Sequence, residues 1–262
     1  MRHLSILVHY FAQYAKARLA YPGDFLIAVL TSFLGTVAGF GFLYVLFHRV
    51  SALDGWSFEE LLFIYGFALT CLGFFNVLSM NLYEFGERYV MEGRFDQILL
   101  RPLHSLFQVI FESFRIESFQ EVFTGILVVG YAWQKLELPL TLLDVVLFPI
   151  MLTCGVAIYL SVFIMLSSLS FWFEDRVGVS PPIYNMIPFG RYPITIYNTF
   201  LQFLLSWIIP FAFASFYPST YFLQRREFAL FFCLVPLVAI VFFLLALFIW
   251  KRGVMGYQST GS

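Results

Sequence analysis

The sequence is short of charge. Of 262 residues only 12% are Asp, Glu, Lys or Arg, whereas 61% are hydrophobic and 21% are aromatic. A soluble domain typically carries about a quarter charged residues. A water-soluble globule of this size could not hide so much apolar surface, because a large part of any globule faces solvent. The composition therefore predicts an integral membrane protein rather than an unusually apolar soluble one.

Sequence motifs for catalysis are also missing. There is no GxxxxGK[ST] phosphate loop, and no HExxH, GxSxG or paired Cys/His metal spacing. Cys71, Cys154 and Cys233 fall inside apolar stretches without CxxC spacing, which is typical of small buried hydrophobes. The net charge is -1, with no polybasic run or acidic tail to suggest nucleic acid as a partner. We therefore expect a protein that is not an enzyme and that binds no metal or cofactor itself.

Long uncharged runs mark where the chain crosses a membrane, since a spanning helix needs about 20 mainly apolar residues. Four such runs are clean, and a fifth is weaker because it has to include Glu121. A sixth lies in the run between Arg191 and Arg225. The predicted spans are 25–48, 60–83, 117–134, 145–173, 194–209 and 228–250.

The run after Arg191 is too long for one span and short for two, and Pro193, Pro210 and Pro218 interrupt it. We expect Arg191 at the cytoplasmic edge, a span at 194–209, and then a re-entrant segment at 210–224. Pro210 and Pro218 would bracket this segment, which enters from the outer side and returns. Its backbone must be covered by protein or line a cavity, because lipid offers no hydrogen bonds.

The predicted fold class is all-α integral membrane: a single transmembrane domain, 1–262, with six transmembrane helices. Residues 1–20 have apolar and polar side chains on opposite helical faces and predict an N-terminal amphipathic interfacial helix. With the N-terminus inside, eleven of the fifteen Lys and Arg residues are cytoplasmic. We therefore expect a multi-pass protein of the plasma (inner) membrane with both termini in the cytoplasm.

The largest polar segment is the cytoplasmic region 84–116, which carries charges of both signs. Gly93 can end one short helix, and Pro102 suits the first turn of another. A compact helical knuckle of mixed charge fits a protein partner, but a solvated loop explains the same pattern equally well. The candidate contact residues are Glu92, Gly93, Arg94, Asp96, Arg101 and Pro102.

Two carboxylates stand at the start of the third predicted span. Glu117 and Glu121 lie one turn apart on a helix and could line a cytoplasmic vestibule, while Arg115 is too close in sequence to reach Glu117 on a helix. The simpler interpretation is a helix whose first two turns protrude into water. No carboxylate is expected at mid-membrane, which argues against a proton- or sodium-driven carrier.

Two local motifs carry a resemblance. Gly93-Arg94-Phe95-Asp96-Gln97-Ile98-Leu99-Leu100-Arg101-Pro102-Leu103 looks like the G-x-x-D-x-x-L-x-R-P segment of one branch of type-2 (ABC-2-like) ABC export permeases. Gly190-Arg191-Tyr192-Pro193, the stretch from Ile209 to Phe213, and Tyr217-Pro218 are similar to the same branch's fifth-helix region. The order of interfacial helix, six spans, knuckle and re-entrant segment matches along the whole chain.

The resemblance implies a permease subunit that forms the path with a second permease, identical or homologous. A separate ATPase subunit, in two copies, would bind ATP and Mg, and the knuckle would dock on it as a coupling helix. An ATP-independent channel or secondary carrier and a non-transporting membrane scaffold are the alternatives.

Overall fold

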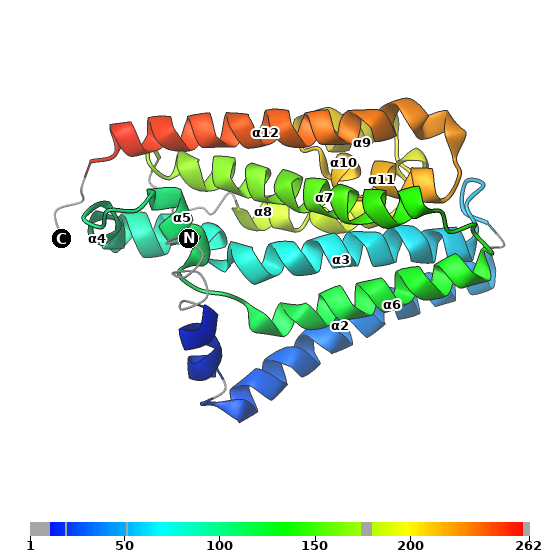
Figure 1. Ribbon diagram of the computed structural model, residues 1–262, viewed down its shortest axis with the longest axis horizontal. Helices are drawn as coiled ribbons and strands as arrows, with labels where there is room; N and C mark the ends of the chain where they lie inside the picture. Colours follow the sequence, from blue (N-terminus) through cyan, green and yellow to red (C-terminus); the bar gives the residue numbers. More distant parts are fainter. Residues whose placement is uncertain (1–10, 19, 51, 174–179, 259–262) are drawn as a thin grey trace.

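The computed structural model describes residues 11–18, 20–50, 52–173 and 180–258. Every regular element in these ranges is a helix or helical turn, apart from one isolated bridge between Leu53 and Trp56. The long helices run side by side along the long axis of the molecule (Figure 1). The predicted all-α class is confirmed for this part of the chain.

Five long helices form the body. They are α2 (Pro22–Arg49), α3 (Phe58–Tyr83), α6 (Phe119–Lys135), α7 (Leu142–Leu169) and α12 (Ala229–Gly256). Short elements fill the rest: η1 (Gly86–Met91), α4 (Arg94–Leu99), α5 (Ser105–Phe111), η2 (Ile116–Ser118), α8 (Ser180–Tyr184), η3 (Ile187–Arg191), η4 (Ile194–Ile196), α9 (Thr199–Phe203), η5 (Leu204–Ile208), α10 (Phe211–Ala214), α11 (Phe216–Phe222) and η6 (Arg226–Phe228).

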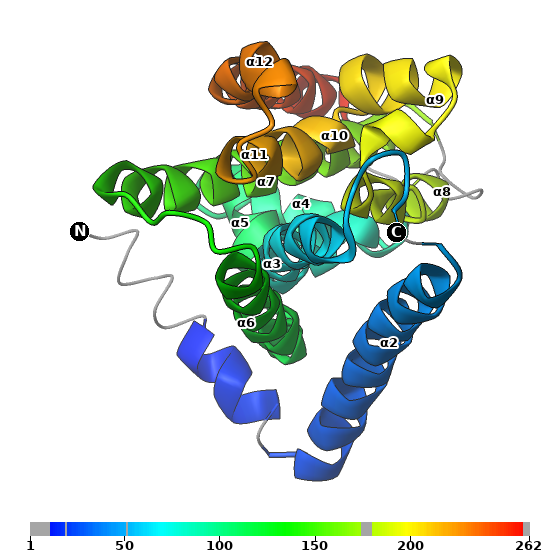
Figure 2. The ribbon, with the colours of Figure 1, turned by 90° about the vertical axis from the view of Figure 1, so that its right-hand side faces the viewer.

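Helix α3 occupies the centre, with α6 on one side and α7 on another, and α12 packs on α7. Helix α2 lies outermost and touches mainly α6 and η2 (Figure 2). Residues 84–116, the knuckle, sit together with the end of α12 at one end of the molecule, which we call the knuckle end (Figure 1). The connections α2–α3, α6–α7 and α11–α12 gather at the opposite end.

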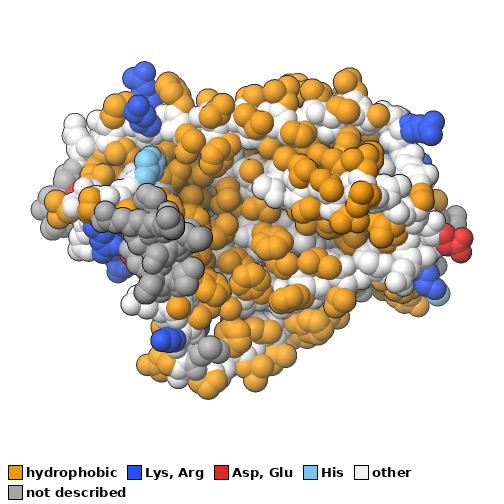
Figure 3. Space-filling view, viewed as in Figure 1, with side chains coloured by type: hydrophobic (Ala, Val, Ile, Leu, Met, Phe, Trp, Pro, Cys, Tyr) orange, Lys and Arg blue, Asp and Glu red, His pale blue; other side chains and the backbone are white. Residues whose placement is uncertain are grey.

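The surface of the body is apolar. Hydrophobic side chains cover the long middle of the face in Figure 3, while Lys, Arg, Asp and Glu stand at the two ends. Exposed leucines, phenylalanines and valines run along α2, α7 and α12. Water would not tolerate patches of this extent on a monomer, whereas lipid does.

Four helices are long and apolar enough to cross a membrane: Pro22–Arg49, Phe58–Ser79, Leu142–Leu169 and Arg226–Gly256. A bent pair, Thr199–Ile208 with Phe211–Phe222, brings the number to five if it counts as one span. Helix α6 has 17 residues, about 25 Å at 1.5 Å per residue, which is shorter than a typical hydrocarbon core of about 30 Å. The multi-pass membrane class is confirmed, and the number six stays a prediction.

The predicted span at 194–209 differs from the structure, which divides it into η4, α9 and the π-helical η5. Asn198 has extended backbone and caps α9 through its side chain, which accepts from the Leu201 backbone N–H at 2.9 Å. Pro210 follows η5 at a break, where the chain bends by 66° into α10 and α11. Pro218 does not end this segment but lies in the first turn of α11, where proline is tolerated.

The first arm of this bent pair begins at the end of the molecule opposite the knuckle, and the second arm ends there. Thr195, just before the first arm, accepts a hydrogen bond from the Trp56 indole N–H at 3.1 Å. Arg225, just after the second arm, bonds both carboxylate oxygens of Glu60 at 2.8 and 2.9 Å. At the bend, the Phe211 ring packs 5.2 Å from Tyr159, which is 17 residues into α7 and so about 25 Å from its start. Residues 199–222 therefore form a hairpin, which we call the inserted hairpin.

Arg191 does not lie at the knuckle end. Its Nη1 atom donates to the Tyr65 hydroxyl at 3.1 Å, and Tyr65 is only two turns into α3 from the opposite end. Before it in the chain, Tyr184 donates to Asn76, about 11 residues deeper along α3. The segment 184–195 thus runs along α3, whereas the sequence prediction began the fifth span only at residue 194.

Candidate functional site

The knuckle owes its compact shape to one glycine. Gly93 has φ 71°, in the left-handed region that costs glycine little, and it separates η1 from α4 as predicted. Pro102 differs from its prediction: it lies in the bend before α5, whose first residue is Ser105 and whose N-cap is His104. The chain therefore turns twice within a few residues, and α4 is held between η1 and α5.

Six aromatic side chains fasten the knuckle to the body. Three come from the knuckle itself, one from the turn that follows α7, and two from the end of α12 and the residue after it. Their ring centroids lie between 5.0 and 6.1 Å apart in the pairs formed around Phe95, Phe171 and Trp250. This aromatic cluster consists of Phe85, Tyr89, Phe95, Phe171, Trp250 and Tyr257.

The cluster is tightly packed because α12 has a glycine at the point where it meets Phe171. A Cβ on Gly253 would stand 2.2 Å from the Phe171 ring, so only glycine lets α12 approach this close. The Trp250 indole N–H also donates to the Ser105 hydroxyl of α5 at 3.1 Å. Aromatic pairs of this geometry contribute about 0.5–1.5 kcal/mol each beyond the area that they bury.

Polar bonds close the knuckle from within. Gln108 of α5 donates to the carbonyls of Ile98 and Leu103 at 3.0 and 2.9 Å. Asn81, near the end of α3, donates to the Val109 carbonyl at 2.7 Å and accepts from the Ser113 hydroxyl at 2.6 Å. These bonds satisfy the buried amide N–H groups of Gln108 and Asn81, and they tie α5 to α4 and to the end of α3.

A tyrosine and a carboxylate add a further tie. The Tyr89 hydroxyl donates to the Glu112 carboxylate. Burial and this carboxylate raise the pKa of Tyr89 well above its ordinary value, so the hydroxyl keeps its proton at any physiological pH.

The outer face of the knuckle stays free. Glu92 and Arg94 are half exposed and pair with each other at 3.0 Å, and Arg101 is exposed beside them. Leu100 is 85% exposed and Leu99 lies next to it, so a charged rim borders an apolar tip. Such a combination is typical of protein interfaces. The two leucines were missed from sequence, although the pair stands directly before Arg101-Pro102 in the motif.

Asp96 points elsewhere. It lies against Tyr257 of the aromatic cluster, and burial together with the Asp96 carboxylate raises the pKa of Tyr257 to about 12. Of the six predicted contact residues, the structure brings Glu92, Arg94 and Arg101 to the free face. Asp96 joins the knuckle to the C-terminal end of α12, while Gly93 and Pro102 shape the turns.

Glu117 and Glu121 have separate surroundings. Glu117 is buried between Arg18 and Arg115, with Oε1 at 3.6 Å from each guanidinium. Arg115 reaches it, contrary to the sequence prediction, because Arg115 has φ −95° and ψ 80° before the turn η2 and so is not helical. Arg18 belongs to the helical residues 11–18; residues 1–10 of the predicted interfacial helix lie outside the described residues.

Glu121 joins three helices. It accepts hydrogen bonds from Ser32 of α2 at 3.0 Å and from Asn76 of α3 at 2.8 Å. A cavity of about 250 Å³ lies nearby, lined by Asn76, Ser79, Tyr83, Glu84, Arg115 and Tyr184. Neither Glu117 nor Glu121 lines it, so their role in a vestibule stays a prediction.

Metal-binding groups do not gather anywhere in the described ranges, where no three His, Cys, Asp or Glu residues come close enough to hold an ion. In a comparison with known protein families, residues 33–261 match the family described as ABC-2 family transporter protein. This is well over half of the chain. The chain belongs to the ABC-2 transporter family.

No curated protein and no solved structure matches the chain. The family match confirms the resemblance inferred from the two motifs. This ABC-2 protein is therefore a multi-pass membrane component of a transporter, and its knuckle and inserted hairpin fall inside the matched residues.

Proposed function

We propose that this ABC-2 protein is the permease subunit of an ATP-driven exporter and that the knuckle is its coupling element. A separate ATPase, in two copies, would bind ATP and Mg, and a second permease, identical or homologous, would complete the path. The observation that carries this proposal is the pairing of a fastened inner side with a free outer side on the knuckle. The inner side is held by the aromatic cluster, and the outer side exposes Glu92, Arg94, Leu100 and Arg101.

The proposed mechanism follows from the attachment of the knuckle to the long helices. ATP binding would draw the two ATPase copies together and displace the knuckles seated on them. Because the aromatic cluster joins the knuckle to α7 and α12, and Asn81 joins it to α3, this displacement would move three helices at once. The nucleotide would thereby shift the population from an inward-open to an outward-open state.

The proposed topology keeps six crossings and cytoplasmic termini, with the knuckle end in the cytoplasm. In this topology, residues 184–195, which run along α3, form the core of the fifth crossing in place of the predicted span 194–209. The inserted hairpin would then enter from the outer side and return, and Arg225 would lie outside. Its covered backbone fits the requirement that irregular segments in a membrane be shielded by protein: Phe211, Ala212, Phe213 and Ala214 are all buried.

The test reverses the charges on the free face. Arg94→Glu and Arg101→Glu should weaken association with the proposed ATPase by about tenfold or more, because each reverses a charge in the contact. Leu100→Ser should do the same by removing the apolar tip. Arg252→Glu is the matched control, since Arg252 lies at the knuckle end but stacks on Phe248 of its own helix.

Association is measured by co-purification, and coupling by ATP hydrolysis of the whole complex in lipid. All variants should insert and fold normally, because the altered side chains are exposed. Unchanged association and hydrolysis in the double variant Arg94→Glu/Arg101→Glu would show that the knuckle does not dock an ATPase. A channel, carrier or scaffold would then explain the fold better.

A further inference from the structure

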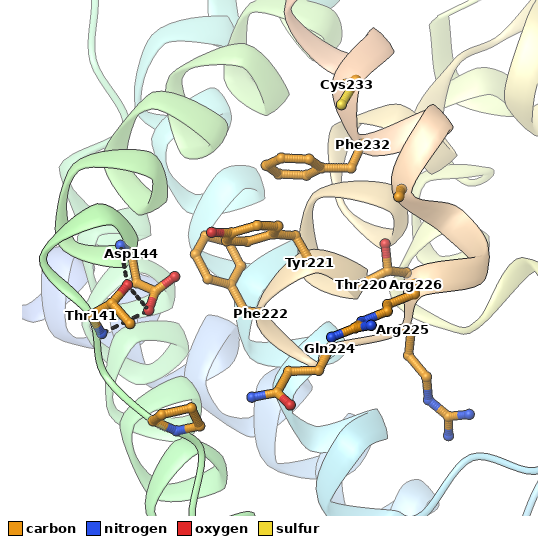
Figure 4. Close-up of a pocket in the computed structure, with 12 residues that line it drawn as sticks. Thr141, Asp144, Thr220, Tyr221, Phe222, Gln224, Arg225, Arg226, Phe232 and Cys233 are labelled. Atoms are coloured by element: carbon orange, nitrogen blue, oxygen red, sulfur yellow. Dashed lines mark hydrogen bonds between the residues drawn. The ribbon is translucent and has the colours of Figure 1, made fainter.

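A cavity of about 460 Å³ opens at the end opposite the knuckle, between the start of α7, the end of α11 and the start of α12 (Figure 4). Its volume falls within the range of about 300–1,000 Å³ that is common for ligand sites. The cavity is distinct from the knuckle and plays no part in the coupling proposed above. It needs only the membrane placement that the family match supports.

The floor of the cavity is aromatic. The Tyr221 and Phe232 rings stack with their centroids 4.4 Å apart, and Phe222 packs edge-on to Tyr221 at 5.2 Å. Figure 4 shows the three rings gathered in the middle of the cavity. Outside it, α7 and α12 expose Leu142 and Leu230, so the cavity adjoins surface suited to lipid tails.

One cation on the wall is unused. Arg225 is occupied, since it bonds both oxygens of Glu60 and the Gly55 carbonyl. Its neighbour Arg226 lines the same cavity, but its side chain makes no hydrogen bond or ion pair with any residue that the structure describes. A guanidinium beside an apolar cavity favours an anionic group, and phosphate suits its planar fork.

One anion stands on the opposite wall. Asp144 is buried, and its Oδ2 accepts from the Thr141 backbone N–H at 2.8 Å and from the Thr141 hydroxyl at 2.7 Å. Its Oδ1 accepts none of these bonds, and Figure 4 shows it turned toward the cavity. A plain anion in the cavity would meet repulsion from this carboxylate, whereas a ligand with a positive group would not.

We propose that this cavity binds a zwitterionic membrane lipid. The phosphate lies at Arg226, the ammonium group at Asp144, and an acyl chain against Tyr221, Phe222 and Phe232. Both charges of the headgroup then meet a partner of opposite sign, and the tail meets the aromatic rings. An anionic lipid satisfies one wall alone.

The protein contains its own reporter. Cys233 is exposed and lines the cavity, while Cys154 lies in a separate apolar groove with Pro236 and Ile240. The purified full chain in dodecyl maltoside is treated with N-ethylmaleimide, and peptide mass spectrometry follows the modification of each cysteine. Dodecylphosphocholine, dodecyl phosphate and dodecyltrimethylammonium are added in turn, since they share a tail and differ in charge.

Dodecylphosphocholine should slow the modification of Cys233 but not of Cys154, and more strongly than either singly charged amphiphile. Arg226→Gln should raise its half-protecting concentration about tenfold, while Arg226→Lys should restore most of the effect. Asp144→Asn keeps an oxygen that can accept from Thr141. It should raise the half-protecting concentration of dodecylphosphocholine about fivefold, and it should not weaken the protection of Cys233 by dodecyl phosphate. Arg49→Gln is the matched control, because Arg49 is a cation at the same end that does not line the cavity.

Equal protection by dodecyl phosphate and dodecylphosphocholine in the unmodified protein would overturn the zwitterion assignment. So would protection that survives both Arg226→Gln and Asp144→Asn. Protection by free phosphocholine at the same concentration as dodecylphosphocholine would overturn the assignment to a lipid.

Discussion

The contact between α3 and α6 depends on a glycine, which makes Gly125→Ala a strict test of the packing. A Cβ on Gly125 would stand 2.3 Å from the Thr70 hydroxyl oxygen and 2.7 Å from both the Gly66 carbonyl oxygen and the Thr70 backbone nitrogen. The Thr70 hydroxyl cannot simply turn away without losing its bond to the Gly66 carbonyl at 2.8 Å. Two of the three obstructing atoms are backbone, so the helices themselves must separate.

The cost can be worked out from these distances. Overpacking of this kind typically costs about 1–3 kcal/mol, and alanine recovers about 0.5–1 kcal/mol through its higher helix propensity. The net loss for Gly125→Ala should be about 1–2 kcal/mol. Gly130→Ala, on the same helix, has nothing within 4 Å of its Cβ and should be neutral or slightly stabilising.

The assay is the melting temperature of the purified protein in one detergent. For a chain of this length a difference of about 2 kcal/mol between the two variants corresponds to roughly 4–8 °C. If Gly125→Ala and Gly130→Ala had the same melting temperature, the close approach of α3 and α6 would be wrong. Small residues at the contact would then have no packing role, contrary to what membrane helix pairs require.

Three further predictions follow from the structure. Trp250→Ala should lower the free energy of unfolding by about 3–5 kcal/mol and make the knuckle sensitive to protease, whereas Trp207→Ala, which removes a half-exposed ring, should cost far less. Melting temperatures and limited proteolysis test this, and equal loss of stability in the two variants would refute the packing role of the aromatic cluster. A cysteine at Pro139 should react with an impermeant thiol reagent outside intact cells and one at Arg94 should not; the reverse would invert the topology. Because the pKa of Tyr257 is raised in the folded state, its contribution to stability is complete below the ordinary tyrosine pKa near 10 and is lost as pH rises through about 12. Tyr257→Phe should remove that loss from the pH dependence of melting, and an unchanged profile would contradict the raised pKa.

The long apolar helices could be predicted from the sequence because charges mark their ends. The predicted spans at 25–48, 60–83, 145–173 and 228–250 coincide closely with α2, α3, α7 and α12. Lipid forces each of these segments to be helical regardless of its neighbours, so local composition suffices. The two proline-containing motifs were likewise enough to identify the family.

The inserted hairpin was harder to place because its two arms have the same composition. Nothing in the residues themselves distinguishes a span from a descending arm; the turn at Pro210 becomes visible only when Thr195 and Arg225 are found at the same end of the molecule. The aromatic cluster escaped prediction for a related reason. Its residues come from three stretches separated by more than 70 positions, and each alone is an ordinary aromatic residue near a span end.

Helix α3 imposes a condition on how the chain is made. In its most apolar 18-residue stretch, 89% of the residues are buried by the protein, against 11% for α2, yet the two helices are equally hydrophobic. Chains enter the membrane from the N-terminus, so α3 arrives before α6, α7 and the inserted hairpin have been synthesised. It must therefore be soluble in lipid on every side, even on the faces that lipid never touches afterwards. The composition of α3 therefore meets the needs of membrane insertion as well as those of the final packing. A polar residue introduced in its middle should impair insertion, and not only transport.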